Sequence, residues 1–142
     1  YPHFAADALA KSVSLAGLRY EEKPALGGRR TARSDSPNGG WKNAGFRGYA
    51  DYMQTEEFDK ALDELMIHGA TERTAIMCAE AVPWRCHRSL VADALVIRGW
   101  EVTHILGHGQ IRPHHLTTFA KVQSGRLVYP ASPDPGSTLQ MF

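Results

Sequence analysis

The chain has 142 residues, of which 43% are hydrophobic and 22% charged, and its formal net charge is +1 at pH 7. This composition is typical of one globular domain with a packed core and excludes a disordered chain. The near-neutral charge excludes a long-range attraction to nucleic acid or anionic membranes, although local basic clusters could still bind nucleic acid. No apolar run approaches the roughly 20 residues that cross a bilayer. With two cysteines and no signal-peptide pattern, the sequence predicts a cytoplasmic protein that does not contact membranes.

The first part of the chain predicts one helix before a long loop and one helix after it. Apolar residues recur at helical spacing over 4–16, and 18–22 has the pattern of a short strand. Residues 24–45 are crowded with Gly, Pro, Ser, Asn and Arg. Such composition predicts a loop, and loops of this length are usually functional or mobile. A short helix is expected over 46–53.

The middle of the chain predicts alternating helices and strands. A helix begins after the N-cap Thr55 and ends at Gly69. The apolar run over 73–79 then predicts a strand covered on both faces. A helix of about three turns that ends at Gly99 follows, and 100–106 predicts another strand. Strand, helix and strand in this order indicate a βαβ unit and a sheet that is at least partly parallel.

These elements predict the α/β class: a small three-layer Rossmann-like domain with a mostly parallel sheet and a late edge strand at 125–130. One domain is expected over 1–131. The Pro-, Gly- and Ser-rich residues 132–142 predict a poorly ordered tail.

Residues 78–89, CAEAVPWRCHRS, contain both cysteines together with an acid, a histidine and two arginines. Cys78 is expected to end the buried strand, and Cys86 to begin the next helix, so both should line one crevice at the carboxyl end of the sheet. A helix N-terminus carries unpaired N–H groups and a partial positive charge, which attract an anion and lower the pKa of a thiol. Cys86 is therefore the better-placed nucleophile and Cys78 the second.

The other polar residues of this motif offer partners for a bound anion or a reactive thiol. Arg88 and Arg85 would donate bidentate hydrogen bonds to an oxyanion, while Glu80 or His87 would carry a proton. Purely structural roles remain open: a cysteine at a strand end can be a core residue, His87 a solvated cap, and Arg88 a surface partner of Asp93 or Glu80.

Four stretches resemble the DUF488 family of uncharacterised proteins over roughly residues 1–130: LGGRR at 26–30, FRGYADYM at 46–53, CAEAVPWRCHRSLVADAL at 78–95 and HIL at 104–106. The resemblance implies a small three-layer α/β domain with no established activity. It also implies a strand–helix–strand segment ahead of the point where this chain starts. Without that segment, exposed strand edges would favour a homodimer.

The resemblance further implies one shared site, composed of Arg29, Arg30, Arg47, Tyr49, Tyr52, Cys78, Glu80, Cys86, His87, Arg88 and His104. Arginines and tyrosines in this number fit a small anionic ligand, such as a phosphate or a nucleotide, because guanidinium groups match phosphate and rings stack on bases. For the two tyrosines alone, a core-facing pair on one helix is the simpler interpretation.

Three functions follow from these residues. The first is an enzyme with a cysteine nucleophile, a hydrolase or transferase of a phosphate-bearing substrate, although the spacing departs from the Cys-x(5)-Arg of cysteine phosphatases. The second is a non-catalytic module that binds a nucleotide or nucleic acid. The third is a zinc site from Cys78, Cys86 and His87; it ranks last because their spacing is not a common zinc-finger spacing, so neither metal nor cofactor is expected. A reversible Cys78–Cys86 disulfide is a related redox alternative.

Overall fold

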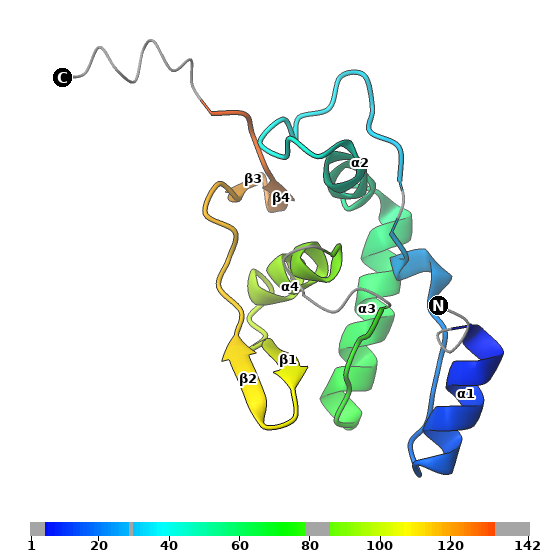
Figure 1. Cartoon of the computed structure of the whole chain (residues 1–142). Coiled ribbons are helices and arrows are strands. Elements are labelled where there is room, and N and C mark those ends of the chain that lie inside the picture. The colour runs from blue at the N-terminus through cyan, green and yellow to red at the C-terminus, as the bar shows by residue number, and fades with distance from the viewer. Residues whose placement is uncertain (1–4, 29, 79–85, 133–142) are drawn as a thin grey trace.

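The computed structural model describes residues 5–28, 30–78 and 86–132 (Figure 1). Its helices are α1 (Ala6–Leu15), the 3-10 helix η2 (Pro24–Leu26), α2 (Ala44–Tyr52), α3 (Glu56–Thr71) and α4 (Arg88–Val96). All four predicted α-helices are therefore present. Thr55 is the N-cap of α3, as expected, and its side chain accepts a hydrogen bond from the backbone N–H of Phe58. Gly69 does not end α3, which continues to Thr71.

The strands form two small antiparallel sheets. Strands β1 (Thr103–Gly107) and β2 (Gln110–Pro113) form one hairpin, and β3 (Lys121–Gln123) and β4 (Arg126–Val128) form the other. The predicted strands at 100–106 and 125–130 correspond to β1 and β4. The second hairpin turns at Ser124 and Gly125, which both have positive φ, as tight hairpin turns require.

The expected mostly parallel, Rossmann-like sheet is not found in the described part of the chain, where every strand pair is antiparallel. Neither 18–22 nor 73–78 forms a strand. A strand needs the backbone of a neighbour to complete its hydrogen bonds, and none of the strands above pairs with either segment. Met77, in the apolar run predicted to be covered on both faces, is 53% exposed. The protein is thus a mixed α/β structure without the predicted βαβ unit.

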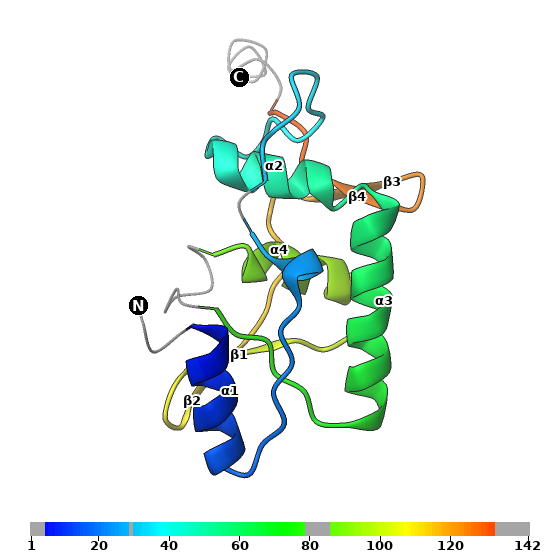
Figure 2. The same ribbon diagram turned by 90° about the vertical axis from the view of Figure 1, so that its right-hand side faces the viewer.

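The core lies between helices α2, α3 and α4 and the β3–β4 hairpin (Figures 1 and 2). Its largest fully buried apolar or aromatic side chains are Tyr49, Tyr129, Phe58, Leu62, Leu90 and Val91. Helix α4 runs through the middle of the molecule, so most of its side chains are buried. The residues that this helix carries are therefore positioned by packing on several sides.

Helix α1 stands at the edge of the molecule, and an extended segment connects it to η2 (Figure 2). Leu15, near its end, is 81% exposed. Surface ion pairs join the connecting segment to α3, with Arg19 paired to Glu72 and Lys23 to Glu64. Such exposed pairs contribute little stability.

The long loop over 24–45 packs onto α2. A Cβ atom at Gly48 would lie 2.0 Å from the carbonyl oxygen of Arg30, so only glycine lets the loop cross the helix here. The hydroxyl group of Tyr49 donates to the carbonyl of Leu26, and that of Tyr52 donates to the carbonyl of Ala25. These contacts hold the beginning of the loop against the face of α2 that points toward α4.

The second half of the loop is held by the buried carboxylate of Asp51 in α2. This carboxylate accepts hydrogen bonds from the Arg33 backbone N–H, the Ser36 hydroxyl and the Asn38 side-chain amide. The Asn38 oxygen in turn accepts from the backbone N–H of Tyr129. One buried carboxylate therefore links the loop to α2 and, through Asn38, to the segment after β4.

Among the described residues, none of the helices combines the length and the apolarity that a membrane span requires. The predicted tail at 132–142 lies outside the described residues from 133 onward. The boundary of the single domain at residue 131 stays a prediction.

Candidate functional site

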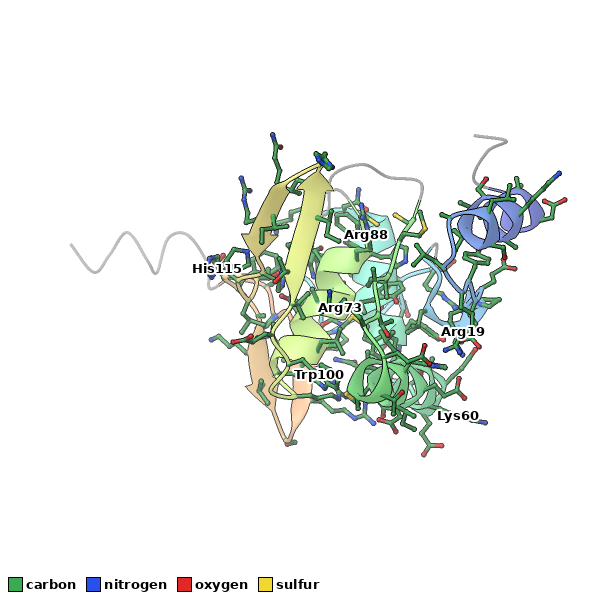
Figure 3. The ribbon with its side chains drawn as sticks, turned by 90° about the horizontal axis from the view of Figure 1, so that it is seen from below. Arg19, Lys60, Arg73, Arg88, Trp100 and His115 are labelled. Atoms are coloured by element: carbon green, nitrogen blue, oxygen red, sulfur yellow. The ribbon has the colours of Figure 1, made fainter. Side chains whose placement is uncertain are left out.

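A cluster of thiols forms around the start of α4; we call Cys78, Cys86, His87 and Arg88 the thiol cluster. The sulfur atoms of Cys78 and Cys86 lie 2.8 Å apart, and both cysteines are free thiols. The backbone N–H and the Nε of Arg88 each lie 3.4 Å from the Cys86 sulfur, and His87 Nδ1 lies 3.6 Å from it. Figure 3 shows Arg88 with sulfur atoms beside it. The two halves of the motif thus meet at one helix N-terminus.

The surroundings of Cys86 favour its thiolate form. The residue is only 5% exposed, and this burial by itself raises the pKa of its thiol. Hydrogen bonds from His87, from Cys78 and from both the backbone and the guanidinium of Arg88 outweigh burial and lower the pKa of Cys86 to about 6. A thiolate is the reactive form of cysteine, so Cys86 has the chemical character of a nucleophile near neutral pH.

The glycine-rich loop and α2 both reach this cluster. A Cβ atom at Gly28 would lie 2.9 Å from His87 Nδ1, so the loop passes directly against the imidazole. The ring of Tyr49 lies 5.0 Å from that of His87, between centroids. Burial, followed by the neighbouring Tyr52, raises the pKa of Tyr49, which therefore stays a neutral phenol. The guanidinium of Arg30 lies 3.7 Å above the Tyr52 ring.

Both predicted tyrosines are thus core residues, and Tyr49 also borders the thiol cluster. Tyr49 is 1% exposed, and its hydroxyl group donates a hydrogen bond to the backbone of the loop. This hydroxyl group is therefore not directed at a ligand. Arg47 lies elsewhere, because its guanidinium donates to the carbonyl of Trp41. Arg29, Glu80 and Arg85 lie outside the described residues, and their predicted roles remain predictions.

A second polar cluster, which the sequence motifs did not indicate, is centred on Asp93 in α4. The carboxylate is fully buried, and its oxygens accept four hydrogen bonds from His114 Nε2, the backbone and hydroxyl of Thr117, and the hydroxyl of Tyr129. His114 Nδ1 lies 2.7 Å from Nε2 of His104. We call Asp93, His114 and His104 the imidazole relay. The alternative in which Arg88 pairs with Asp93 on the surface is wrong, because Asp93 is not at the surface.

The sequence does contain a signal for this cluster. Asp93 interrupts an otherwise apolar helix segment, LVADAL, at 90–95. A carboxylate that packing forces into a core needs several donors, and histidines are natural candidates.

Two cavities border α4. One of about 230 Å³ is lined by Trp41, Ser89, His104, Arg112, His114 and Thr117, together with Pro113 and His115. The other, of about 260 Å³, lies at the C-terminal end of α4, where Asp59 pairs with Arg98 and Arg126. It contains none of the predicted site residues. His104 therefore belongs to a separate cavity, and the described residues do not bring it to the thiols directly.

Within the described ranges, no group of three or more His, Cys, Asp or Glu side chains is arranged to hold a metal ion. The zinc hypothesis was built on Cys78, Cys86 and His87, to which His104 could have added a fourth ligand. In the structure, His104 instead faces His114.

Comparison with known protein families gives one result. The family model described as "Domain of unknown function DUF488" matches residues 1–95. The chain belongs to the DUF488 family. The match covers 95 of 142 residues, including the thiol cluster and Asp93 but not His104 or His114. Neither the curated proteins nor the solved structures gave a match.

Membership of the DUF488 family confirms the resemblance seen in the sequence, and the description of the family assigns no activity to the domain. The chemistry must therefore be inferred from the geometry of the residues themselves.

Proposed function

We propose that this DUF488 domain is a thiol-dependent enzyme, a hydrolase or transferase that acts on a small phosphate-bearing substrate with Cys86 as nucleophile. The observation that carries the proposal is the set of contacts around the Cys86 sulfur. One backbone N–H, one guanidinium, one imidazole and one thiol converge on it. A structural cysteine in a core needs none of these partners.

The proposed chemistry has two steps. The Cys86 thiolate attacks phosphorus, so that an S–P bond forms and the bond from phosphorus to the leaving oxygen breaks. The leaving oxygen takes a proton from the imidazolium of His87. In the second step, a water molecule or an acceptor hydroxyl attacks phosphorus, gives its proton to His87 and releases the thiolate. Arg88 would bind the non-bridging oxygens and so stabilise the charge that develops on them.

A second candidate is thiol–disulfide exchange, which the separation of 2.8 Å between the two sulfurs favours. The Cys86 thiolate would attack a substrate disulfide and release one substrate thiolate. Cys78, after losing its proton, would then attack Cys86, form the Cys78–Cys86 disulfide and release the second thiolate. The substrate disulfide is reduced by two electrons, and the cysteine pair is oxidised by two.

The first experiment measures the rate of iodoacetamide alkylation against pH, with the modified cysteine located by mass spectrometry. Cys86 in the wild-type protein should show an inflection near pH 6. An inflection near the ordinary thiol value of about 8.5 would remove both candidates. Cys78→Ser serves as the matched variant because it keeps Cys86 and Arg88.

The second experiment separates the two candidates. With p-nitrophenyl phosphate, the proposed enzyme should release a burst of one nitrophenolate per protein and carry a phosphate on Cys86. Cys86→Ser should abolish the burst, whereas Cys78→Ser should retain it. A protein that instead cycles oxidised dithiothreitol and loses this activity in both variants is a dithiol oxidoreductase. Unchanged phosphate affinity in Cys86→Ser, without a burst in the wild type, would indicate a binding module.

A further inference from the structure

The cavity beside the imidazole relay has the features of a second site. We propose that it binds a small oxyanion and transfers a proton, with Nδ1 of His104 as the base and with His114 and Asp93 as positioning residues. This inference does not depend on the proposed nucleophile, because its base is His104 and its cavity contains neither cysteine, although the charge of Arg88 acts on both clusters.

Hydrogen bonds constrain the tautomers along the relay. The Asp93 carboxylate can only accept, so His114 Nε2 must carry the proton of their 2.7 Å contact. We take the other nitrogen of His114 as the acceptor of the next 2.7 Å contact, in which His104 Nε2 then donates. The lone pair of His104 is therefore at Nδ1. No described residue makes a hydrogen bond to this atom.

Burial and the charges around His104 favour its neutral form. Its burial, then the charges of His114, Arg88 and Arg112, lower its pKa below the ordinary histidine value, whereas Asp93 raises it. These groups face His104 from the loop after β2, from α4 and from β2. A proton accepted at Nδ1 makes the ring cationic, and the buried Asp93 carboxylate stabilises that charge through His114.

The walls of the cavity fit an oxyanion with an exchangeable proton. Arg112 lines the cavity and supplies a permanent positive charge. The volume of about 230 Å³ fits a small phosphate- or carboxylate-bearing molecule rather than a nucleic acid.

The proton transfer itself is simple. The O–H bond of a hydroxyl group on the bound ligand, or of a water molecule beside it, breaks and leaves its electron pair on oxygen. An N–H bond forms at His104 Nδ1. The oxygen becomes a nucleophile held close to Arg112. Ser89 joins this cavity to the thiol cluster, because its hydroxyl donates to the carbonyl of Cys86.

The first test is NMR of protein labelled with ¹⁵N in histidine. His104 should appear as the tautomer protonated at Nε2, with a titration midpoint below the ordinary value of about 6.5. His114→Gln should lose the fixed tautomer. Thr117→Val, which removes a hydroxyl from Asp93 but leaves both imidazoles, should retain it. A wild-type His104 protonated at Nδ1 in its neutral form would overturn the proposal.

The second test is titration with inorganic phosphate, observed at the same histidine signals. Bound phosphate should raise the midpoint of His104, because an anion favours the protonated ring. Arg112→Gln should weaken phosphate binding about tenfold or more. Arg126→Gln, a matched change in the other cavity, should leave binding unchanged. A His104 midpoint that phosphate does not move, or equal effects of the two arginine variants, would contradict the site.

The two proposals can fail separately. Cys86→Ser should preserve the response of His104 to phosphate, whereas His114→Gln should preserve the inflection of Cys86 alkylation near pH 6. If Cys86→Ser instead removes the response of His104, the two clusters act as one site and the separate oxyanion site is overturned.

Discussion

The thiol cluster and the imidazole relay each include one residue of α4, Arg88 and Asp93, yet they are built in opposite ways. The partners of Cys86 come from neighbouring positions in the sequence, with Cys78 as the most distant. The partners of Asp93 come from the segment after β2 and from the segment after β4, and His104 of β1 joins through His114. The first cluster therefore shapes the reactivity of one atom, whereas the second joins separate segments of the fold. Mutations in the relay should affect stability most, and mutations in the thiol cluster should affect chemistry most.

The strongest test of this difference is Asp93→Ala. The change leaves the buried donors of His114, Thr117 and Tyr129 without their acceptor, so the free energy of unfolding should fall by about 3–5 kcal/mol. Urea unfolding at pH 7 measures it. Asp59→Ala, which removes only a partly exposed ion-pair partner, should cost about 1 kcal/mol or less. Equal losses in Asp93→Ala and Asp59→Ala would contradict the special contribution of the buried carboxylate to stability.

Gly48→Ala tests whether the loop over α2 supports the thiol cluster. Alanine favours a helix over glycine by about 1 kcal/mol. Here its Cβ would lie 2.0 Å from the Arg30 carbonyl oxygen, so the loop must move and unfolding should become easier by about 1–3 kcal/mol. Urea unfolding and the alkylation rate of Cys86 report the two effects. Gly45→Ala, at an exposed position of α2, is the control and should destabilise the protein much less, because its Cβ would approach only the side-chain oxygen of Asn43, at 3.1 Å.

The ionisation of Cys86 should make the free energy of unfolding depend on pH. Its folded-state pKa of about 6 lies below the ordinary value. The thiolate therefore stabilises the folded protein fully above the ordinary value, and this contribution is lost as the pH falls through about 6. Between these limits, the wild type should gain up to about 1.4 kcal/mol per pH unit relative to Cys86→Ser. Urea unfolding under reducing conditions measures it, and a constant difference would contradict the low pKa.

The smallest effect is expected at the far end of α4. Arg126 pairs with Asp59 at the surface and is itself half-exposed. Arg126→Ala should change the free energy of unfolding by less than about 1 kcal/mol, because water competes for both charges. The same urea experiment measures it. A larger loss would mean that the ion pair of Arg126 with Asp59 contributes as much to stability as the buried hydrogen bonds of the relay.

The candidate site could be predicted only where its members are neighbours in the sequence. The spacing of Cys86 and Arg88 at the start of a helix was enough to place a thiol among backbone and guanidinium donors. The contact of Gly28 with His87 was not predicted, because the family resemblance placed only the next residues, Arg29 and Arg30, in one site with His87. The relay was missed because Asp93 meets His114 and Tyr129 only after the chain has turned back on both sides of α4.

The sequence by itself determined the helices and the start of α4, because a helix makes its hydrogen bonds within four residues and its caps lie next to it. Tertiary structure alone decided the strand pairing. The apolar run over 73–78 has the composition of a strand, but a strand exists only where another backbone completes it. Tertiary structure also decided which buried donors reach Asp93, because a carboxylate inside a core takes its partners from whichever segments pack around it.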